Sequence, residues 1–185
     1  MLIDITLEIT PKMAADAQGN EKKALAGHLG THFDIMDKVF PLTYIKRNGI
    51  AFDVSHVTGR DIGLSDIELD KVSRDMFVAF FTGHIERTGY GGKAYLSGHP
   101  QLSHELLGAL LDKEISLIGV DFAGIRRRKE HVPADQACAD RSVFVIENLC
   151  GLKAVVDAGG KFLAYTLPMR CAGMTGLPCR VIAEI

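Results

Sequence analysis

Apolar and polar residues alternate along several short stretches of the chain, and this period of two predicts β-strands with one buried face. The first such stretch covers residues 2–9, and a second covers residues 49–57. Residues 75–85 are mostly apolar, which is typical of a strand buried on both faces. Two further stretches, residues 160–169 and 178–185, close the chain. The pattern therefore predicts a protein built around a β-sheet.

One segment repeats its apolar residues at helical spacing instead. Residues 103–114 carry paired leucines, with Ser103 at the N-cap position, and predict an α-helix. This helix runs straight into an apolar strand at residues 115–121, and another strand is predicted at residues 142–149. Such a direct connection indicates a parallel crossover, so we predict an α/β fold with a mixed sheet. Residues 11–27 are polar and small, and we expect a loop there.

The composition is that of an ordinary globular domain, with 47% hydrophobic and 24% charged residues. The length of 185 residues fits a single domain over residues 1–185 with a substantial core. A formal net charge of −2 argues against the basic excess of a nucleic-acid-binding surface. The N-terminus lacks a signal-peptide layout, and no apolar run approaches the ~20 residues that span a bilayer. We expect a cytoplasmic protein without nucleic-acid or membrane partners, whose four cysteines stay reduced.

The stretch HLGTHFDIMDK, residues 28–38, is the strongest candidate for chemistry. In a regular strand the Cα atoms of His28 and His32 would lie ~13 Å apart, and in a helix Asp34 would point away from His32. Convergence therefore requires a bend, which Gly30 can supply, and we expect a loop that gathers ligands. Neutral imidazoles and a carboxylate suit zinc or manganese. The alternative is a loop of hydrogen-bonded histidines without a metal.

The stretch resembles the H-x-G-T-H-x-D signature of the cyclase family of metal-dependent hydrolases, which includes bacterial kynurenine formamidase and isatin hydrolase. Four other segments are similar to family segments and follow in family order: FDVSHVTGRDIGLSDIE, FFTGHIERTGYGGKAYLSGHPQLSHELLGALLDKEISLIGVDFAGI, VFVIENLCGL and LPMRCAGMTGLPCRVIAE. The likeness runs from residue 28 to the C-terminus, whereas the first 27 residues match poorly. It implies a small barrel-like β core flanked by helices (the swivelling β/β/α type) in a homo-oligomer, either a dimer or a tetramer.

The resemblance also assigns ligands. It implies that His28, His32 and Asp34 bind metal, and that Glu147, in the sequence ENL, helps to bind a second ion. One or two divalent ions per chain, zinc or manganese, are expected on this basis.

Two functional positions depart from the family pattern. The family's acid/base histidine falls on Lys38, its metal-binding histidine twelve residues before the glutamate falls on Asp135, and a proline position of the motif holds Met36. Two hypotheses follow. Either Lys38 pairs with Asp135 and replaces the second metal electrostatically, or Asp135 binds the ion through oxygen and shifts the preference toward manganese or magnesium.

Five other histidines and one cysteine are weaker candidates for metal binding. His131 is an alternative ligand if the loop that it shares with Asp135 is offset from the family spacing, but we expect it at the surface. Cys138 is expected to be a buried thiol. The remaining histidines show no ligand spacing and are expected to pack or to lie at the surface: His56, His84, His99 and His104.

The function implied by the resemblance is that of a metal-dependent amidohydrolase acting on C–N bonds other than peptide bonds. The substrate would be a formamide or a small cyclic amide, with arylformamidase activity on a kynurenine precursor as the family analogy. Lys38 would stabilise the oxyanion or shuttle a proton, and Arg126 and Arg127 would bind a substrate carboxylate. The alternative is a non-catalytic protein on the same fold that binds a small anion, with Lys38 and Asp135 replacing the usual histidines.

Overall fold

The alternating stretches become the strands of a mixed sheet. The computed structural model describes residues 1–21, 23 and 25–185. The strands in these residues are β1 (Leu2–Asp4), β2 (His32–Asp34), β3 (Lys46–Asp53), β4 (Phe77–Phe81), β5 (Leu117–Val120), β6 (Phe144–Glu147), β7 (Lys161–Pro168) and β8 (Gly176–Glu184).

The sheet closes on itself. Its order is β1-β8-β2-β6-β5-β4-β3-β7, and β7 also pairs with β8, so the strands from β8 to β7 form a ring. The neighbours β3, β4, β5 and β6 run parallel, whereas the pairs that involve β2, β7 or β8 are antiparallel. β1 lies outside the ring and extends the edge of β8. The predicted α/β fold with a small barrel-like core is therefore confirmed.

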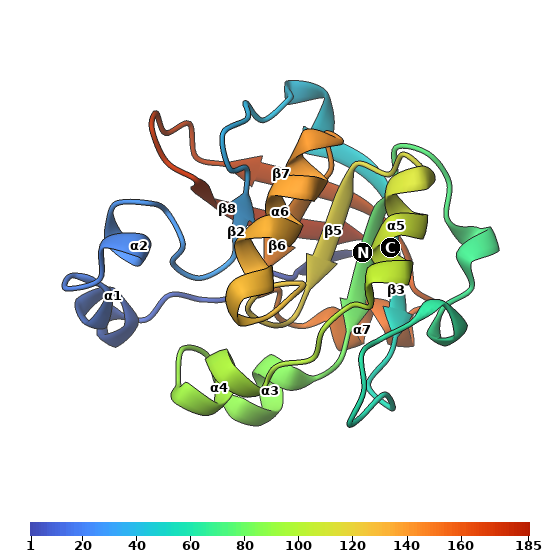
Figure 1. The fold of residues 1–185 in the computed structure, drawn as a ribbon, viewed down its shortest axis with the longest axis horizontal. Coiled ribbons are helices and arrows are strands. Elements are labelled where there is room, and N and C mark those ends of the chain that lie inside the picture. Colours follow the sequence, from blue (N-terminus) through green and yellow to red (C-terminus); the bar gives the residue numbers. More distant parts are fainter.

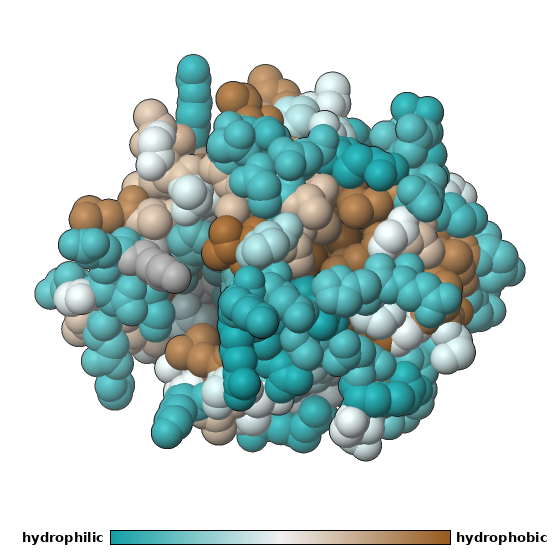
Figure 2. Space-filling view, in the orientation of Figure 1, coloured by the Kyte–Doolittle hydropathy of each residue, from teal (hydrophilic) through white to brown (hydrophobic). Residues whose placement is uncertain are grey.

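Helices cover the outside of this barrel (Figure 1). They are α1 (Pro11–Ala17), α2 (Glu21–Ala24), α3 (His84–Thr88), α4 (Lys93–Gly98), α5 (His104–Asp112), α6 (His131–Asp140) and α7 (Leu152–Asp157), with 3₁₀ turns at Leu42–Ile45, Leu64–Asp66, Leu69–Lys71 and Arg128–Glu130. Among the described residues, none of these helices is long and apolar enough to cross a membrane. Figure 2 shows apolar side chains in a hollow between α5 and α6, where a cavity of about 480 Å³ is lined mainly by residues of these two helices.

Each face of the barrel wall packs its own apolar core. Along β4, Phe77, Ala79 and Phe81 belong to a cluster that gathers side chains from every strand of the ring. Val78 and Phe80 belong to a second cluster that includes the leucines of α5. The prediction that this strand is buried on both faces is confirmed, because all five residues of β4 are buried.

Most predicted elements occur near their expected bounds, with four differences, one of which, strand β2 in the expected loop at residues 28–38, is described with the site. Ser103 caps α5 by accepting a hydrogen bond from the Leu106 amide at 3.1 Å, as expected. The opening strand is shorter than predicted and ends at Asp4. The expected loop at residues 11–27 contains α1 and α2, with Thr10 and Pro11 providing an N-cap and a first helical residue. The third difference, α6, concerns the site.

The interior of the barrel leaves no room for a side chain at Gly119 in β5. A Cβ atom there would lie 2.5 Å from Phe77 and 2.6 Å from Leu149. We expect Gly119→Ala to lower the free energy of unfolding by about 1–3 kcal/mol, the usual effect of overpacking a core. Denaturant unfolding measures this change.

The matched control is Gly108→Ala on the exposed face of α5, where a Cβ atom meets nothing within 4 Å. Alanine should stabilise this helix by about 0.5–1 kcal/mol relative to glycine. Equal stabilities of the two variants would contradict the packing described for Gly119.

Candidate metal centre

Strand pairing places the first ligand-type side chains. In β2, His32 lies directly opposite Glu147 of β6, and Asp34 lies two residues further along the same strand. Because side chains alternate across a strand, these three share one face. Gly30, just before β2, has a φ of +69°, a left-handed conformation that favours glycine. The expected bend at Gly30 is therefore present, although residues 32–34 form a strand rather than a loop.

The bend brings His28 back onto His32 and Asp34. Nδ1 of His28 lies 3.0 Å from Nε2 of His32 and 3.1 Å from Oδ1 of Asp34, and the last two atoms are 3.7 Å apart. A tetrahedral ion with bonds of ~2.0–2.1 Å would space its ligand atoms by roughly 3.3 Å. Three potential ligand atoms thus converge at a spacing that a single cation would fit.

The protonation of His32 is fixed by its second nitrogen. Nδ1 lies 2.9 Å from the Gly30 carbonyl oxygen, which can only accept a hydrogen bond, so Nδ1 carries the proton. Burial lowers the pKa of His32, which keeps the ring neutral. Nε2 therefore presents a lone pair to the other two atoms, as a metal-binding imidazole does.

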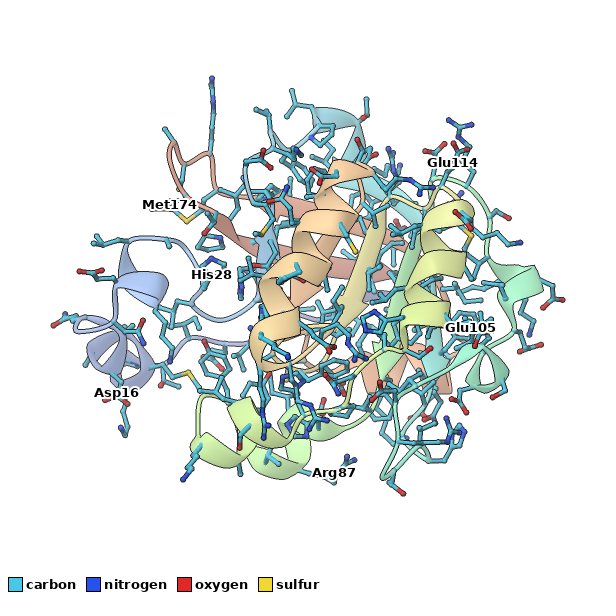
Figure 3. All side chains as sticks on the ribbon, in the orientation of Figure 1. Asp16, His28, Arg87, Glu105, Glu114 and Met174 are labelled. Carbon is cyan, nitrogen blue, oxygen red and sulfur yellow. The ribbon has the colours of Figure 1, made fainter. Side chains whose placement is uncertain are left out.

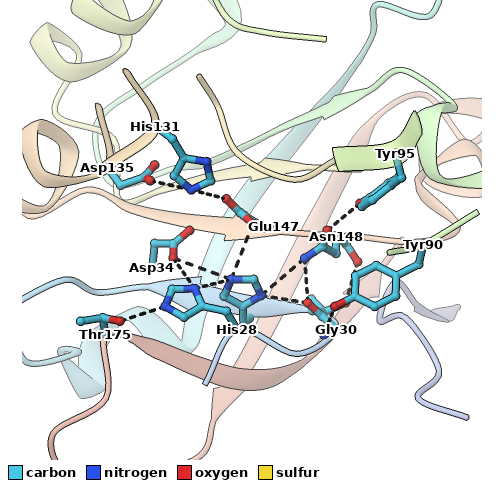
Figure 4. A network of polar contacts seen from close by, with 12 residues as sticks. His28, Gly30, Asp34, Tyr90, Tyr95, His131, Asp135, Glu147, Asn148 and Thr175 are labelled. Atoms are coloured by element: carbon cyan, nitrogen blue, oxygen red, sulfur yellow. Dashed lines mark hydrogen bonds and ion pairs between the residues drawn. The ribbon is translucent and has the colours of Figure 1, made fainter. Parts of the chain in front are cut away.

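A hydrogen-bond network holds this carbonyl in place (Figure 4). Nδ2 of Asn148 donates to the Gly30 oxygen at 2.8 Å, and the Tyr95 hydroxyl donates to Oδ1 of Asn148 at 2.5 Å. The Gly30 amide donates to the Tyr90 hydroxyl oxygen at 2.9 Å. These contacts fix the position of the Gly30 carbonyl. Because His32 binds this carbonyl through Nδ1, they also fix the orientation of the His32 ring.

A second group of ligand-type residues shares Asp34 with the first. Nε2 of His131 lies 3.2 Å from Oδ2 of Asp135 and 3.3 Å from Oε1 of Glu147. One ligand atom from each of Asp34, His131, Asp135 and Glu147 lies within 4.8 Å of the others. His131 and Asp135 are four residues apart on α6, so they project from the same face of the helix. The His131 ring packs on Gly124, where a Cβ atom would lie 2.5 Å from the ring.

Several oxygens in these groups have no hydrogen-bond partner. Among the described side chains, the buried atoms in this state are Oδ2 of Asp34, Oδ1 of Asp135 and Oε1 of Glu147. A buried carboxylate oxygen without a donor is strongly unfavourable unless a cation balances it. The two groups together therefore have the chemistry of a metal centre for one or two ions.

The charges of the three carboxyl groups are coupled. Burial, and then the negative charges of Asp34 and Asp135, raise the pKa of Glu147 well above its ordinary value. Burial and the Asp34 charge do the same to the pKa of Asp135. For Asp34, burial opposes ionisation, but the contacts with neighbouring histidines, above all the hydrogen bond from His28, outweigh it and lower the pKa. Without a cation, the cluster therefore favours one ionised carboxyl group, Asp34.

A cavity of about 590 Å³ gives access to this centre. In Figure 3, His28 lies between α2 and α6, and residues of both helices line the cavity. Its wall outside the ligand groups includes Lys23, Met36, Tyr90, Leu96, His99, Arg128 and Val132. The cavity is thus large enough for a small molecule and combines apolar walls with two cationic side chains.

Comparison with known proteins agrees with this architecture. The family model described as "Putative cyclase" matches residues 3–126, about two thirds of the chain. The chain belongs to the cyclase family. No curated protein sequence matches it significantly.

Solved structures share the fold of this cyclase-family chain. A protein described as a potential metal-dependent hydrolase with cyclase activity is 23% identical, with a TM-score of 0.77 over 99% of this chain and 96% of the other. Isatin hydrolase A from Labrenzia aggregata is 17% identical, with a TM-score of 0.75 over 99% and 93% of the chains. A predicted metal-dependent hydrolase from Bacillus stearothermophilus is 21% identical, with a TM-score of 0.72 over 99% and 97%. At these identities the likeness shows the fold.

The structure brings all five predicted ligands of this cyclase-family chain together and adds a sixth candidate. His28, His32, Asp34, Asp135 and Glu147 all belong to the two groups. His131, which was expected at the surface, lies among them, because the expected loop is helix α6. The four-residue spacing of His131 and Asp135 was the available signal. Metal binding by these residues stays a prediction.

Lys38 lies outside both groups and outside the described cavity wall, which corrects the expected pairing with Asp135 and gives no support to a catalytic role. Its Nζ atom lies 2.7 Å from Asp140 and 3.1 Å from Asp37, not beside Asp135. The hydrogen bond to Asp140, followed by that to Asp37, raises the pKa of Lys38, which makes a proton shuttle less favourable. Met36, at the proline position of the family motif, has a φ of +57°, which a proline, fixed near −65°, cannot adopt.

We therefore expect Lys38→Ala to leave catalysis nearly unchanged. The value of kcat/KM should stay within about twofold of the parent, as for most substitutions at exposed positions. Steady-state kinetics with an amide substrate measure kcat/KM. His32→Ala, which removes a side chain of the centre, serves as the comparison. A drop comparable to that of His32→Ala would contradict the placement of Lys38.

The two predicted substrate-binding arginines also lie elsewhere. Arg126 is buried and donates to Asp61 at 2.6 Å and to Glu130 at 2.5 Å, so its charge is already neutralised. The backbone amide of Arg127 donates to Gln101. Among the described residues, neither arginine lines the cavity, whereas the next one, Arg128, does. Charge type alone could not separate these three neighbours.

The other cysteine and histidine candidates are buried or exposed as the sequence predicted. Cys138 is a buried free thiol, as expected, and burial raises its pKa to about 12. His84 is buried and its ring stacks on Tyr95, which confirms a packing role. His104 is exposed. His99 is buried and stacks on Phe122, which agrees with a packing role, and it also lines the cavity.

Proposed function

We propose that this cyclase-family chain is a metal-dependent hydrolase of amide bonds other than peptide bonds, acting on a formamide or a small cyclic amide. The observation that carries the proposal is the convergence of six ligand-type side chains, three of them with unpartnered carboxylate oxygens, beside a cavity of about 590 Å³. The isatin hydrolases and predicted metal-dependent hydrolases of the same fold support it.

The residues present fit two divalent ions that share Asp34. The group of His28, His32 and Asp34 offers two imidazoles and one carboxylate, a set that suits zinc. The second group offers one imidazole and three carboxylates, and this richer oxygen content favours manganese there.

Residues of the chain orient the metal ligands and contact the substrate. A divalent ion in such a centre acidifies water at neutral pH and polarises a carbonyl oxygen. The Gly30 carbonyl orients His32, and Thr175 bonds Nε2 of His28 at 2.8 Å, so both imidazoles are held for binding. Leu96 and Val132 restrict water around a bound substrate, and Arg128 supplies positive charge for an anionic group.

The alternative, a non-catalytic binder of small anions, is less consistent with the site. Three carboxyl groups face the centre, and Lys38, which was to supply the positive charge, lies outside it. Without a cation, such a centre repels an anion rather than attracting it.

Metal removal and restoration test the proposed function. Protein stripped with a chelator should hydrolyse formanilide or another small amide no faster than buffer, and added zinc or manganese should restore turnover. Metal content per chain, measured by mass spectrometry, should rise in step with activity. Failure of the metal-loaded protein to hydrolyse any amide in a panel of formanilides, lactams and cyclic imides would overturn the proposal.

A further inference from the structure

His99 is packed in the interior, as the sequence predicted, but it also lines the cavity, and none of the roles above uses it. The side chain is 2% exposed, yet it lines the cavity that contains the metal centre. Its ring stacks on Phe122 with centroids 5.6 Å apart and an angle of 17°, and it meets the His84 ring edge-on. The imidazole is therefore held in one orientation by packing on its faces.

The hydrogen bond of His99 determines its tautomer. Nδ1 lies 2.7 Å from the carbonyl oxygen of Pro100, which can only accept, so Nδ1 carries the proton. Burial, assisted by the nearby charges of Arg127, His84 and His131, lowers the pKa of His99 to about 4, so the ring is neutral at neutral pH. Nε2 must then bear a lone pair, and none of the described residues donates a hydrogen bond to it.

The other polar side chains in the cavity wall are committed or are donors. Asn148 uses its amide nitrogen on Gly30 and its amide oxygen on Tyr95. The Tyr90 oxygen accepts from Gly30, Oδ1 of Asn20 accepts from the Lys23 amide, and the Thr175 hydroxyl bonds His28. Lys23 and Arg128 can only donate. Among the polar side chains of the described cavity wall outside the metal centre, His99 thus differs in offering a buried acceptor nitrogen that no described contact uses.

We propose that Nε2 of His99 accepts a hydrogen bond from the N–H of the substrate amide and so selects substrates that carry hydrogen on the scissile nitrogen. This inference rests on the proposed amide hydrolysis and adds a substrate class to it, namely secondary amides and unsubstituted cyclic amides. A substrate with an alkyl group on that nitrogen leaves the buried acceptor unpaired and places a methyl group against it, both of which are unfavourable.

The test compares formanilide with N-methylformanilide, which differ by one methyl group on the nitrogen. The preference, defined as the ratio of kcat/KM for the two substrates, is measured for the parent, His99→Phe and His99→Gln, all loaded with zinc. We expect His99→Phe to lower the preference at least about tenfold, chiefly through slower turnover of formanilide. His99→Gln keeps an acceptor oxygen and should retain most of the preference.

Comparing ratios removes the intrinsic difference in reactivity between the two amides, because it is the same for every variant. The surface control His104→Phe should leave the ratio unchanged. An equal preference in the parent and His99→Phe would overturn the proposal, as would an equal loss in His99→Phe and His99→Gln, since only ring packing would then matter.

A binding measurement separates this inference from the proposed function. Calorimetry gives the dissociation constants of oxindole and N-methyloxindole for the zinc-loaded parent and the two variants, without any need for turnover. We expect the parent to bind oxindole at least about tenfold more tightly than its methyl derivative and His99→Phe to lose this difference. Selective binding without hydrolysis would contradict the proposed function alone, whereas equal affinities, or no binding of either compound, would contradict the role of His99.

Discussion

Replacing Asp34 by asparagine should abolish metal binding at both groups and lower kcat/KM by at least roughly 1,000-fold. Asp34 belongs to both groups, so one substitution removes a ligand from each. Its Oδ1 atom lies 3.1 Å from Nδ1 of His28, and its Oδ2 atom has no hydrogen-bond partner. An amide nitrogen at either position would present hydrogens to the ion instead of a lone pair. A loss of this size corresponds to about 4 kcal/mol of transition-state stabilisation, within the range that a catalytic metal supplies.

Metal content per chain and kcat/KM for formanilide measure the effect. The matched control is Asp37→Asn, the same change three residues further along, where the carboxylate is exposed and pairs with Lys38. It should keep both the metal and the activity. Retention of two ions by Asp34→Asn would mean that the shared position is not a ligand.

Glu147→Gln should act in opposite directions on the metal-free and the metal-loaded protein. In the metal-free protein, burial and the charges of Asp34 and Asp135 raise the pKa of Glu147 well above its ordinary value. A buried group that must bind a proton on folding costs stability at neutral pH, so the neutral amide should stabilise the metal-free protein. In the presence of metal, the same substitution removes a ligand, and the stabilisation that ions give to the parent should largely disappear.

The pH dependence of stability gives an independent check. Carboxyl groups of the unfolded chain release their protons near pH 4, whereas Glu147 and Asp135 in the folded metal-free protein hold theirs to higher pH. The folded state therefore binds more protons over this interval, and the contribution of these groups to stability falls as pH rises through it. Glu147→Gln should make this decline shallower, and thermal unfolding with and without added zinc measures both effects.

The exposed Glu105→Gln in the first turn of α5 serves as the control and should change neither the metal-free stability nor its pH dependence appreciably. A loss of stability in metal-free Glu147→Gln would contradict this prediction. It would mean that the Glu147 carboxylate makes a stabilising contact in the folded protein beyond those described with Asp34, Asp135 and His131.

The parts of the fold that could be predicted are those whose secondary structure is specified by a local sequence pattern. Ser103 and the leucine spacing that follows it specify α5, and the continuous apolar run of β4 specifies a strand with two buried faces. The bend at Gly30 was also predictable, because no regular structure lets His28, His32 and Asp34 meet. In each case the signal lies within about a dozen residues.

The unpredicted parts depend on tertiary context. Helix α6 has almost no apolar periodicity, contains Pro133, and buries Asp135 where a core side chain would be expected, so its pattern does not indicate a helix. The helix instead depends on its packing against β6, a contact that is not visible in the sequence pattern. The position of Lys38 is set by folded contacts with Asp37 and Asp140, and the sequence alone does not show which of the neighbouring carboxylates pairs with it. Likewise, only the folded chain distinguishes the ion-paired Arg126 from Arg128 in the cavity wall.

The direct register of His32 against Glu147 has a consequence for biosynthesis. The two residues are separated by more than a hundred positions, and the rung between them forms only when β6 docks beside β2. A nascent chain that ends before β6 therefore lacks the second group of ligand-type residues, which needs β2, α6 and β6 together. In the proposed two-ion centre, loading of the second ion must follow the pairing of β2 with β6, so the topology of the sheet sets the order of these two events.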